Sequence, residues 1–141
     1  MTLKQPKRIV QKSQNTCWAA ALESWTGVTK PAATSQEGLI AVYAKLADGG
    51  LSLVGLATLA NNYSLIFESA FLSPKAGAAQ YPAQTVARFS ALYVDDLLAK
   101  YGHLLVAYKL LGAGNWWHVV VLYGVAEGTF SMMDPKPRRG W

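Results

Sequence analysis

Residues 10–27 read VQKSQNTCWAAALESWTG and contain the only cysteine of the 141-residue chain. The alanines that follow Cys17 favour a helix over residues 17–26, and Gly27 is a plausible helix stop. Apolar residues recur along this segment at helical spacing, at Trp18, Leu22 and Trp25. The sequence therefore predicts a core helix that begins at Cys17 and is buried on most sides.

Three further helices are expected in the first two thirds of the chain. The periodicity of their apolar residues and serines at capping positions support this prediction. The expected ranges are 36–47, 53–62 after Ser52, and 90–101 between Ser90 and Gly102. A strand is expected over 65–72, followed by a loop rich in Pro, Gly and Ala over 73–84.

The last third of the chain changes to the two-residue period of strands. Strands are expected over 103–111, 117–125 and 129–134, and the turn Ala126-Glu127-Gly128 joins the last two. Because helices come first and a sheet follows, the sequence predicts an α+β fold. In this fold, N-terminal helices pack on a C-terminal antiparallel sheet.

The length and composition fit one domain over residues 1–141 with a sizeable core. The most apolar region, residues 104–125, is interrupted by Lys109, His118 and glycines, so we expect no membrane span. A single cysteine excludes an internal disulfide and the multi-cysteine zinc patterns, and we expect no metal site. The N-terminus is basic without an apolar stretch behind it, so no classical signal peptide is expected.

The formal net charge is +5, and seven of the thirteen cationic residues lie near the two ends. They are Lys4, Lys7, Arg8, Lys12, Lys136, Arg138 and Arg139. Residues 1–9 and 136–141 are interpreted as basic tails, which are solvated or meet an anionic partner. If the segments next to both tails reach one site, the tails form a basic rim there, and an acidic partner is expected. No basic and aromatic motif accompanies the charge, so nucleic acid is not an expected partner.

Cys17 is expected at a helix N-terminus, where amide groups and the helix dipole favour a thiolate. A nearby imidazole would make this thiol a nucleophile. His118 begins a strand and Asp134 ends the next one, sixteen residues later. Because the start of one hairpin strand lies beside the end of the other, the two should be neighbours. No carboxylate follows His103 at such a distance, so His103 is expected to be structural.

Acyl transfer also requires hydrogen-bond donors for an oxyanion. The backbone N–H of Cys17 can supply one of them. A side-chain amide from the preceding loop, which contains Gln11 and Gln14, can supply another.

Gln11, then Cys17-Trp18-Ala19, then His118 in a strand and Asp134 sixteen residues later together resemble the papain-like cysteine peptidases. The ending is more similar to the compact bacterial branch, the bacteriocin-leader peptidases and the effector proteases injected by plant pathogens, which use aspartate where papain has asparagine. In that family the glutamine six positions before the nucleophile helps to form the oxyanion hole. The resemblance therefore implies a papain-like fold and assigns the oxyanion role to Gln11.

Three tryptophans lie next to these positions, at Trp18, Trp116 and Trp117. Tryptophans in proteins most often lie in the core or in the wall of a cleft. Trp18 would pack beneath the nucleophile. Strand alternation places Trp116 and Trp117 on opposite faces, so one of them would line the cleft beside His118. Substrate contact is predicted for this set.

The expected activity is hydrolysis of an amide bond by a Cys-His-Asp triad through a thioester, without a metal or organic cofactor. The resemblance favours a cysteine protease. The same triad also serves a glutamine deamidase or transglutaminase-like effector and a cell-wall amidase. An inactive binding module of the same fold is the non-enzymatic alternative.

The resemblance also implies a bacterial toxin or effector. Such a protein is present in the bacterial cytoplasm before delivery and is secreted or injected without a classical signal peptide. The expected partners are a protein or peptide substrate and an immunity protein that inhibits the enzyme.

Overall fold

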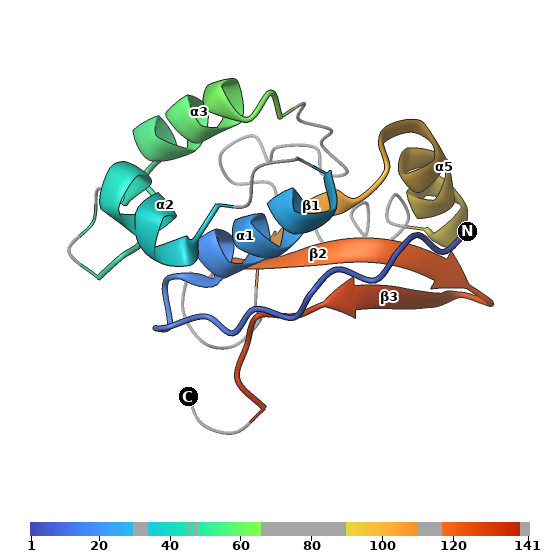
Figure 1. Cartoon of the computed structure of the whole chain (residues 1–141). Coiled ribbons are helices and arrows are strands. Elements are labelled where there is room, and N and C mark those ends of the chain that lie inside the picture. The colour runs from blue at the N-terminus through green and yellow to red at the C-terminus, as the bar shows by residue number, and fades with distance from the viewer. Residues whose placement is uncertain (30–33, 45, 47, 66–89, 110–116, 139–141) are drawn as a thin grey trace, which may run out of the picture.

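The computed structural model describes residues 1–29, 34–44, 46, 48–65, 90–109 and 117–138. The first and last helices lie against a small sheet, and the two helices between them in sequence lie on the other side of the first helix (Figure 1). The helices are α1 (Cys17–Thr29), α2 (Gln36–Tyr43), α3 (Leu53–Asn62) and α5 (Ala91–Tyr101). The strands are β1 (Leu104–Lys109), β2 (Trp117–Ala126) and β3 (Thr129–Met133). The predicted order, helices first and an antiparallel sheet last, is confirmed.

The sheet has the strand order β1-β2-β3, and both pairings are antiparallel. β2 is therefore the central strand, paired with β1 from Leu104↔Leu122 to Lys109↔Trp117. A two-residue turn joins β2 to β3, and Glu127 and Gly128 both have positive φ, 50° and 74°. Two positive φ angles define the type I′ turn, whose twist matches that of paired strands. The predicted hairpin and its turn are confirmed.

The central helix is α1, and it runs past its predicted stop. Ala19, Ala20 and Ala21 are fully buried, as expected for a core helix. Gly27 lies inside the helix, which ends at Thr29, so the prediction of a stop at Gly27 was wrong. Buried Thr26 and the bond from Trp25 Nε1 to the His103 carbonyl (3.0 Å) hold this last part of the helix in place.

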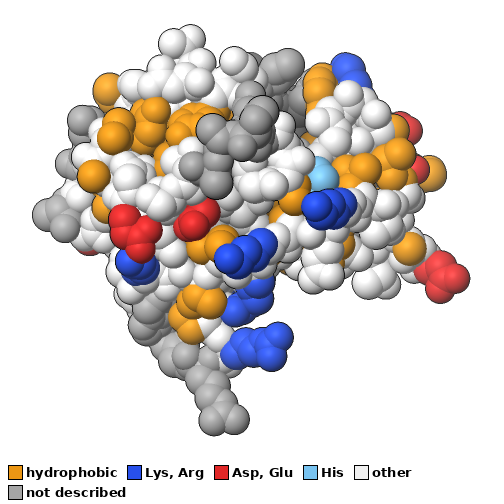
Figure 2. All heavy atoms as spheres, viewed as in Figure 1, with side chains coloured by type: hydrophobic (Ala, Val, Ile, Leu, Met, Phe, Trp, Pro, Cys, Tyr) orange, Lys and Arg blue, Asp and Glu red, His pale blue; other side chains and the backbone are white. Residues whose placement is uncertain are grey.

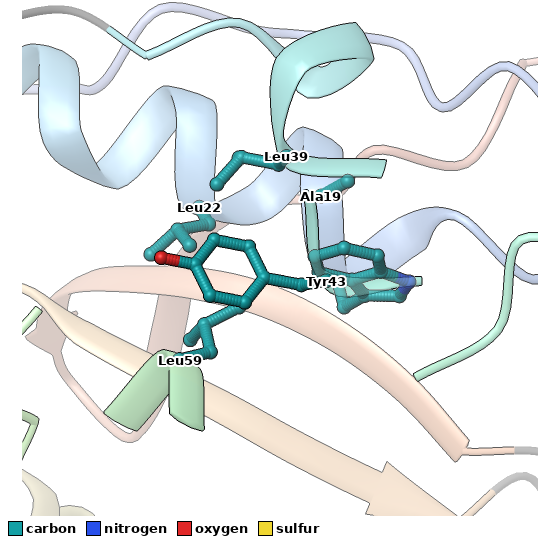
Figure 3. Packing of buried hydrophobic residues seen from close by; sticks show 6 residues of the cluster. Ala19, Leu22, Leu39, Tyr43 and Leu59 are labelled. Carbon is teal, nitrogen blue, oxygen red and sulfur yellow. The ribbon is translucent and has the colours of Figure 1, made fainter. Parts of the chain in front are cut away.

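One face of α1 packs against the two helices that follow it. Figure 3 shows Leu22 of α1 packed with Leu39 and Tyr43 of α2 and Leu59 of α3. The neighbouring face lies on the sheet, where Ala21 contacts Val121 of β2 and Met133 of β3. A small residue at position 21 allows helix and sheet to approach closely, so α1 is held between two layers.

The helix α2 is shorter than predicted. It ends at Tyr43, and Ala44 is already extended, with φ −69° and ψ 116°. Beyond this helix end, the Gly49 carbonyl accepts a bond from Trp18 Nε1 (3.0 Å). The predicted helix over 36–47 was therefore too long, because a contact distant in sequence redirects the chain.

The helices α3 and α5 begin and end close to the positions that their capping residues predicted. Ser52 caps α3 through a bond from Gly55 N–H, and Ser90 caps α5 through a bond from Tyr93 N–H. α5 ends at Tyr101, and Gly102, whose φ is 79°, caps it. The predicted strand over 65–72, apart from Leu65, and the loop over 73–84 lie outside the described residues.

The N-terminal segment runs along the sheet before it enters α1 (Figure 1). It begins beside the end of β2, where Leu3 N–H donates to the Tyr123 carbonyl (2.7 Å) and Thr2 bridges Gly124. A Cβ at Gly124 would lie 3.0 Å from the Thr2 side chain, so this close approach favours glycine. The segment then reaches the C-terminal end, where Gln11 N–H donates to the Pro135 carbonyl (2.9 Å).

Candidate active site

Cys17 is the first residue of α1, and its side chain is only 4% exposed. The loop before it is folded on itself, because Ser13 N–H donates to Thr16 Oγ1 (3.0 Å) and the Thr16 hydroxyl donates to the Ser13 carbonyl (3.1 Å). The Thr16 carbonyl accepts from the N–H groups of Ala19 and Ala20, which starts the helix at this point. The thiol is therefore held at a helix N-terminus, as predicted.

The thiol of Cys17 lies against β2 as well as its own helix. Among the backbone N–H groups that lower the pKa of the thiol, that of Val119 has the largest effect, ahead of those of Trp18 and Cys17 itself. Val119 directly follows His118 in the chain, so the thiol meets the sheet at the histidine. The fold thus brings together two residues that are about a hundred positions apart in sequence.

Burial raises the pKa of the Cys17 thiol above its ordinary value of 9.0. The backbone N–H groups of Cys17 and Trp18 lower the pKa, as expected at a helix N-terminus, and that of Val119 in β2 also lowers it, but burial outweighs all three. The negative charge of Asp134 also raises the pKa, by less than any of the other causes. Burial therefore favours the neutral form of the thiol.

His118 and Asp134 are in contact with each other across the hairpin of β2 and β3. His118 is 6% exposed, and its Nε2 lies 2.7 Å from Oδ1 of Asp134. The same carboxylate oxygen accepts from Lys136 N–H (2.8 Å), which fixes its position. The predicted neighbourhood of His118 and Asp134 across the hairpin is confirmed.

Gln11 is buried in the loop before α1. Its Nε2 donates to the carbonyls of Ser13 (2.7 Å) and Gln14 (3.1 Å), so both amide hydrogens are directed at the loop. Its Oε1 is buried and has no hydrogen-bond partner among the described residues. In this conformation Gln11 braces the loop that carries Cys17.

Of the three tryptophans that were predicted to contact a substrate, only Trp18 has a side chain that the structure describes. Trp18 is 7% exposed and belongs to the core cluster with Leu22 and Tyr43, so it supports α1 and offers little surface to a substrate. Trp116 and the side chain of Trp117 lie outside the described residues. His103 has the structural environment that was expected for it, with its Nε2 2.7 Å from the Lys4 carbonyl.

Sequence reasoning missed Gln36, which lies behind the loop. Its Nε2 donates to the carbonyl of Val10 (2.8 Å), next to Gln11, and its backbone N–H donates to Glu23 of α1 (3.0 Å). Buried Gln36 therefore ties α2 to the segment that enters α1. The sequence around Gln36, which directly follows the capping Ser35, contains no pattern that predicts such a distant contact.

A helix-borne cysteine packed against a sheet that presents a His-Asp pair is the arrangement of the papain-like cysteine peptidases. The family model described as papain-like cysteine protease AvrRpt2 matches residues 2–140, and the chain belongs to this family. No curated protein and no solved structure matches the chain. In the described part of the chain, no helix has the length and apolar character needed to cross a membrane.

Proposed function

We propose that the chain is a cysteine protease with Cys17 as nucleophile, His118 as general base and acid, and Asp134 as the group that orients the imidazole. The observation that carries this proposal is the bond from Val119 N–H to the thiol, beside a histidine that already contacts a carboxylate. A carboxylate accepts hydrogen bonds, so Nε2 carries the hydrogen directed at Asp134. The basic lone pair then resides on Nδ1, which we assign to the thiol proton.

The reaction begins with a neutral thiol, in agreement with its raised pKa. His118 Nδ1 takes the proton as the sulfur attacks the carbonyl carbon of the scissile amide. The imidazolium, stabilised by Asp134, then gives this proton to the leaving amine, and a thioester remains on Cys17. A water molecule, deprotonated by His118, attacks the thioester and releases the acid and the thiol.

The tetrahedral intermediate carries a negative oxygen that needs donors. We assign this role to the backbone N–H of Cys17 and to Nε2 of Gln11. Gln11 Nε2 is bonded to two loop carbonyls, so this role requires it to exchange one of these bonds for the substrate oxygen. Gln11 would then both support the loop and stabilise the intermediate.

The proposed biological setting is supported by the family match. We propose a bacterial effector or toxin that is secreted or injected and acts on a protein of another cell. Its partners are a protein substrate, an acidic partner at the basic rim and an immunity protein that covers the active site. The same triad can hydrolyse a peptide bond, a glutamine side chain or a cell-wall amide, so the test must distinguish these three reactions.

The test is to incubate a proteome with the wild-type protein and with Cys17→Ala, and to map the altered bonds by mass spectrometry. New peptide N-termini that appear only with the wild type are expected. A mass increase of about one dalton at glutamine without cleavage would replace the protease with a deamidase. Muropeptides released from purified sacculi would favour a cell-wall amidase, and no Cys17-dependent change in either sample would favour a binding module.

A further inference from the structure

A solvent-facing pocket lies where the two basic segments of the chain meet. Arg8 Nη2 donates to the Lys136 carbonyl (2.6 Å), which joins the N-terminal segment to the residues after β3. The pocket has a volume of about 400 Å³. Its lining includes Gln5, Arg8, Met132, Asp134, Lys136 and Arg138.

The pocket has an excess of positive charge. Arg8, Lys136 and Arg138 are all exposed, and none of them forms an ion pair with a carboxylate in the described ranges. Asp134, the acidic residue of the lining, is bonded to His118. Figure 2 shows Lys and Arg side chains gathered near the point where the N-terminal segment passes the C-terminal end. An anion that enters the pocket would therefore meet three cationic side chains against one carboxylate.

The pocket is connected to the candidate active site through Asp134. This residue lines the pocket, and its Oδ1 contacts both His118 Nε2 and the backbone N–H of Lys136. The side chain of Asp134 is 43% exposed, so the pocket is open at this point. Asp134 therefore belongs both to the lining of the pocket and to the candidate triad.

We propose that this pocket is a subsite for an acidic side chain of the protein substrate, close to the scissile bond. This inference rests on the proposed protease function. Arginine presents a planar group that binds a carboxylate through two parallel hydrogen bonds, and lysine adds a point charge. Met132, which is 42% exposed, provides an apolar wall for the methylene groups of a glutamate. Charges at such a rim contribute mainly specificity and association rate.

Binding can be tested without catalysis, in the Cys17→Ala background. The probes are a fluorescein-labelled oligoglutamate peptide and its oligoglutamine counterpart, followed by fluorescence anisotropy. We expect the glutamate peptide to bind more tightly, with an affinity that falls as salt is added. The triple variant R8Q/K136Q/R138Q should bind it about tenfold more weakly, because three exposed charge contacts are lost. Lys100→Gln removes the same kind of charge from α5 and should leave binding unchanged.

Equal binding of the two peptides, or equal binding by the triple variant and Lys100→Gln, would overturn the subsite. Binding to phosphatidylserine vesicles but not to the glutamate peptide would also overturn it and favour a membrane surface. Circular dichroism melting of the triple variant shows whether its fold is intact. If it is not, the single variant Arg138→Gln, whose side chain makes no hydrogen bond among those found in the described residues, repeats the comparison.

Cleavage of a proteome-derived peptide library then separates this inference from the proposed function. The wild type and Lys100→Gln should both cleave peptides enriched in Asp or Glu near the scissile bond, and the triple variant should lose this enrichment. Cys17-dependent cleavage with the same profile in all three proteins would end the subsite proposal and leave the protease intact. Glutamate binding without any Cys17-dependent cleavage would retain an acidic ligand site and contradict the protease.

Discussion

His118 and Asp134 are joined by a contact of 2.7 Å between Nε2 and Oδ1, although they lie sixteen positions apart in the sequence. The hairpin of β2 and β3 returns the chain to its starting point, and Lys136 N–H holds the carboxylate in place. The contact places an oriented imidazole one residue before Val119, whose N–H meets the thiol of Cys17. The candidate triad therefore depends on the register of this hairpin.

The role of Asp134 can be tested with two substitutions. One removes its hydrogen bond to His118, and the other removes only its negative charge. Asp134→Ala should lower kcat by about 10²-fold, because the imidazole loses its orienting group. Asp134→Asn should retain more activity, since an amide oxygen can still accept from Nε2. Steady-state kinetics on a cleaved peptide measures both effects. An alanine variant as active as the wild type would remove Asp134 from the mechanism.

Gln11 and Gln14 provide a matched pair in the loop before α1. Gln11→Ala should reduce kcat by about 10²-fold if its amide contributes to the oxyanion hole. Gln14 is exposed and contributes its backbone carbonyl to the loop, so Gln14→Ala should have little effect. Thermal melting of both variants shows whether the loop has lost its brace. Full activity of Gln11→Ala in a folded protein would contradict the assigned role.

Burial of Cys17 also predicts how stability depends on pH. The pKa of the native thiol is raised above 9.0, so the unfolded chain loses this proton at a lower pH than the native protein. The unfolded state then binds fewer protons, and the free energy of unfolding falls as pH rises through about 9. Cys17→Ala lacks this contribution and should lose less stability over the same range. Chemical denaturation of both proteins between neutral and alkaline pH measures the difference, and parallel curves would contradict it.

The packing of α1 against α2 and α3 predicts a large effect at Leu22. This side chain is almost fully buried beside Leu39 and Leu59, so Leu22→Ala should cost about 2–5 kcal/mol of unfolding free energy. Val42 of α2 is exposed, and Val42→Ala should change stability by less than about 0.5 kcal/mol. Urea denaturation distinguishes the two. Equal effects would mean that the core does not lie where the structure places it.

Local signals explain which parts of the fold could be predicted from the sequence. Ser52, Ser90 and Gly102 act within one turn of the helices that they begin or end, so the bounds of α3 and α5 were predictable. The ends of α1 and α2 depend on Trp25 and Trp18, which bond to carbonyls far away in the sequence. No local pattern contains such contacts, and both helix ends were predicted wrongly.

The candidate site also has features that could be predicted from the sequence and features that could not. The contact between His118 and Asp134 could be predicted by counting residues along a hairpin. It is present although the pairing of β2 and β3 shifts register between Leu122 and Gly124. The position of Cys17 at a helix start follows from the alanines behind it. The orientation of the Gln11 amide and the contact from Gln36 depend on packing of the folded chain, so they could not be predicted.

The central claim is that Cys17 is a nucleophile activated by His118. Its most direct test is the rate at which an E-64-type epoxide modifies the protein, followed by intact mass and peptide mapping. The wild type should form one adduct, on Cys17, faster than the amino acid cysteine does, and His118→Ala should lose this advantage. A wild-type rate no higher than that of cysteine, or an equal rate in the His118→Ala variant, would contradict the proposed mechanism.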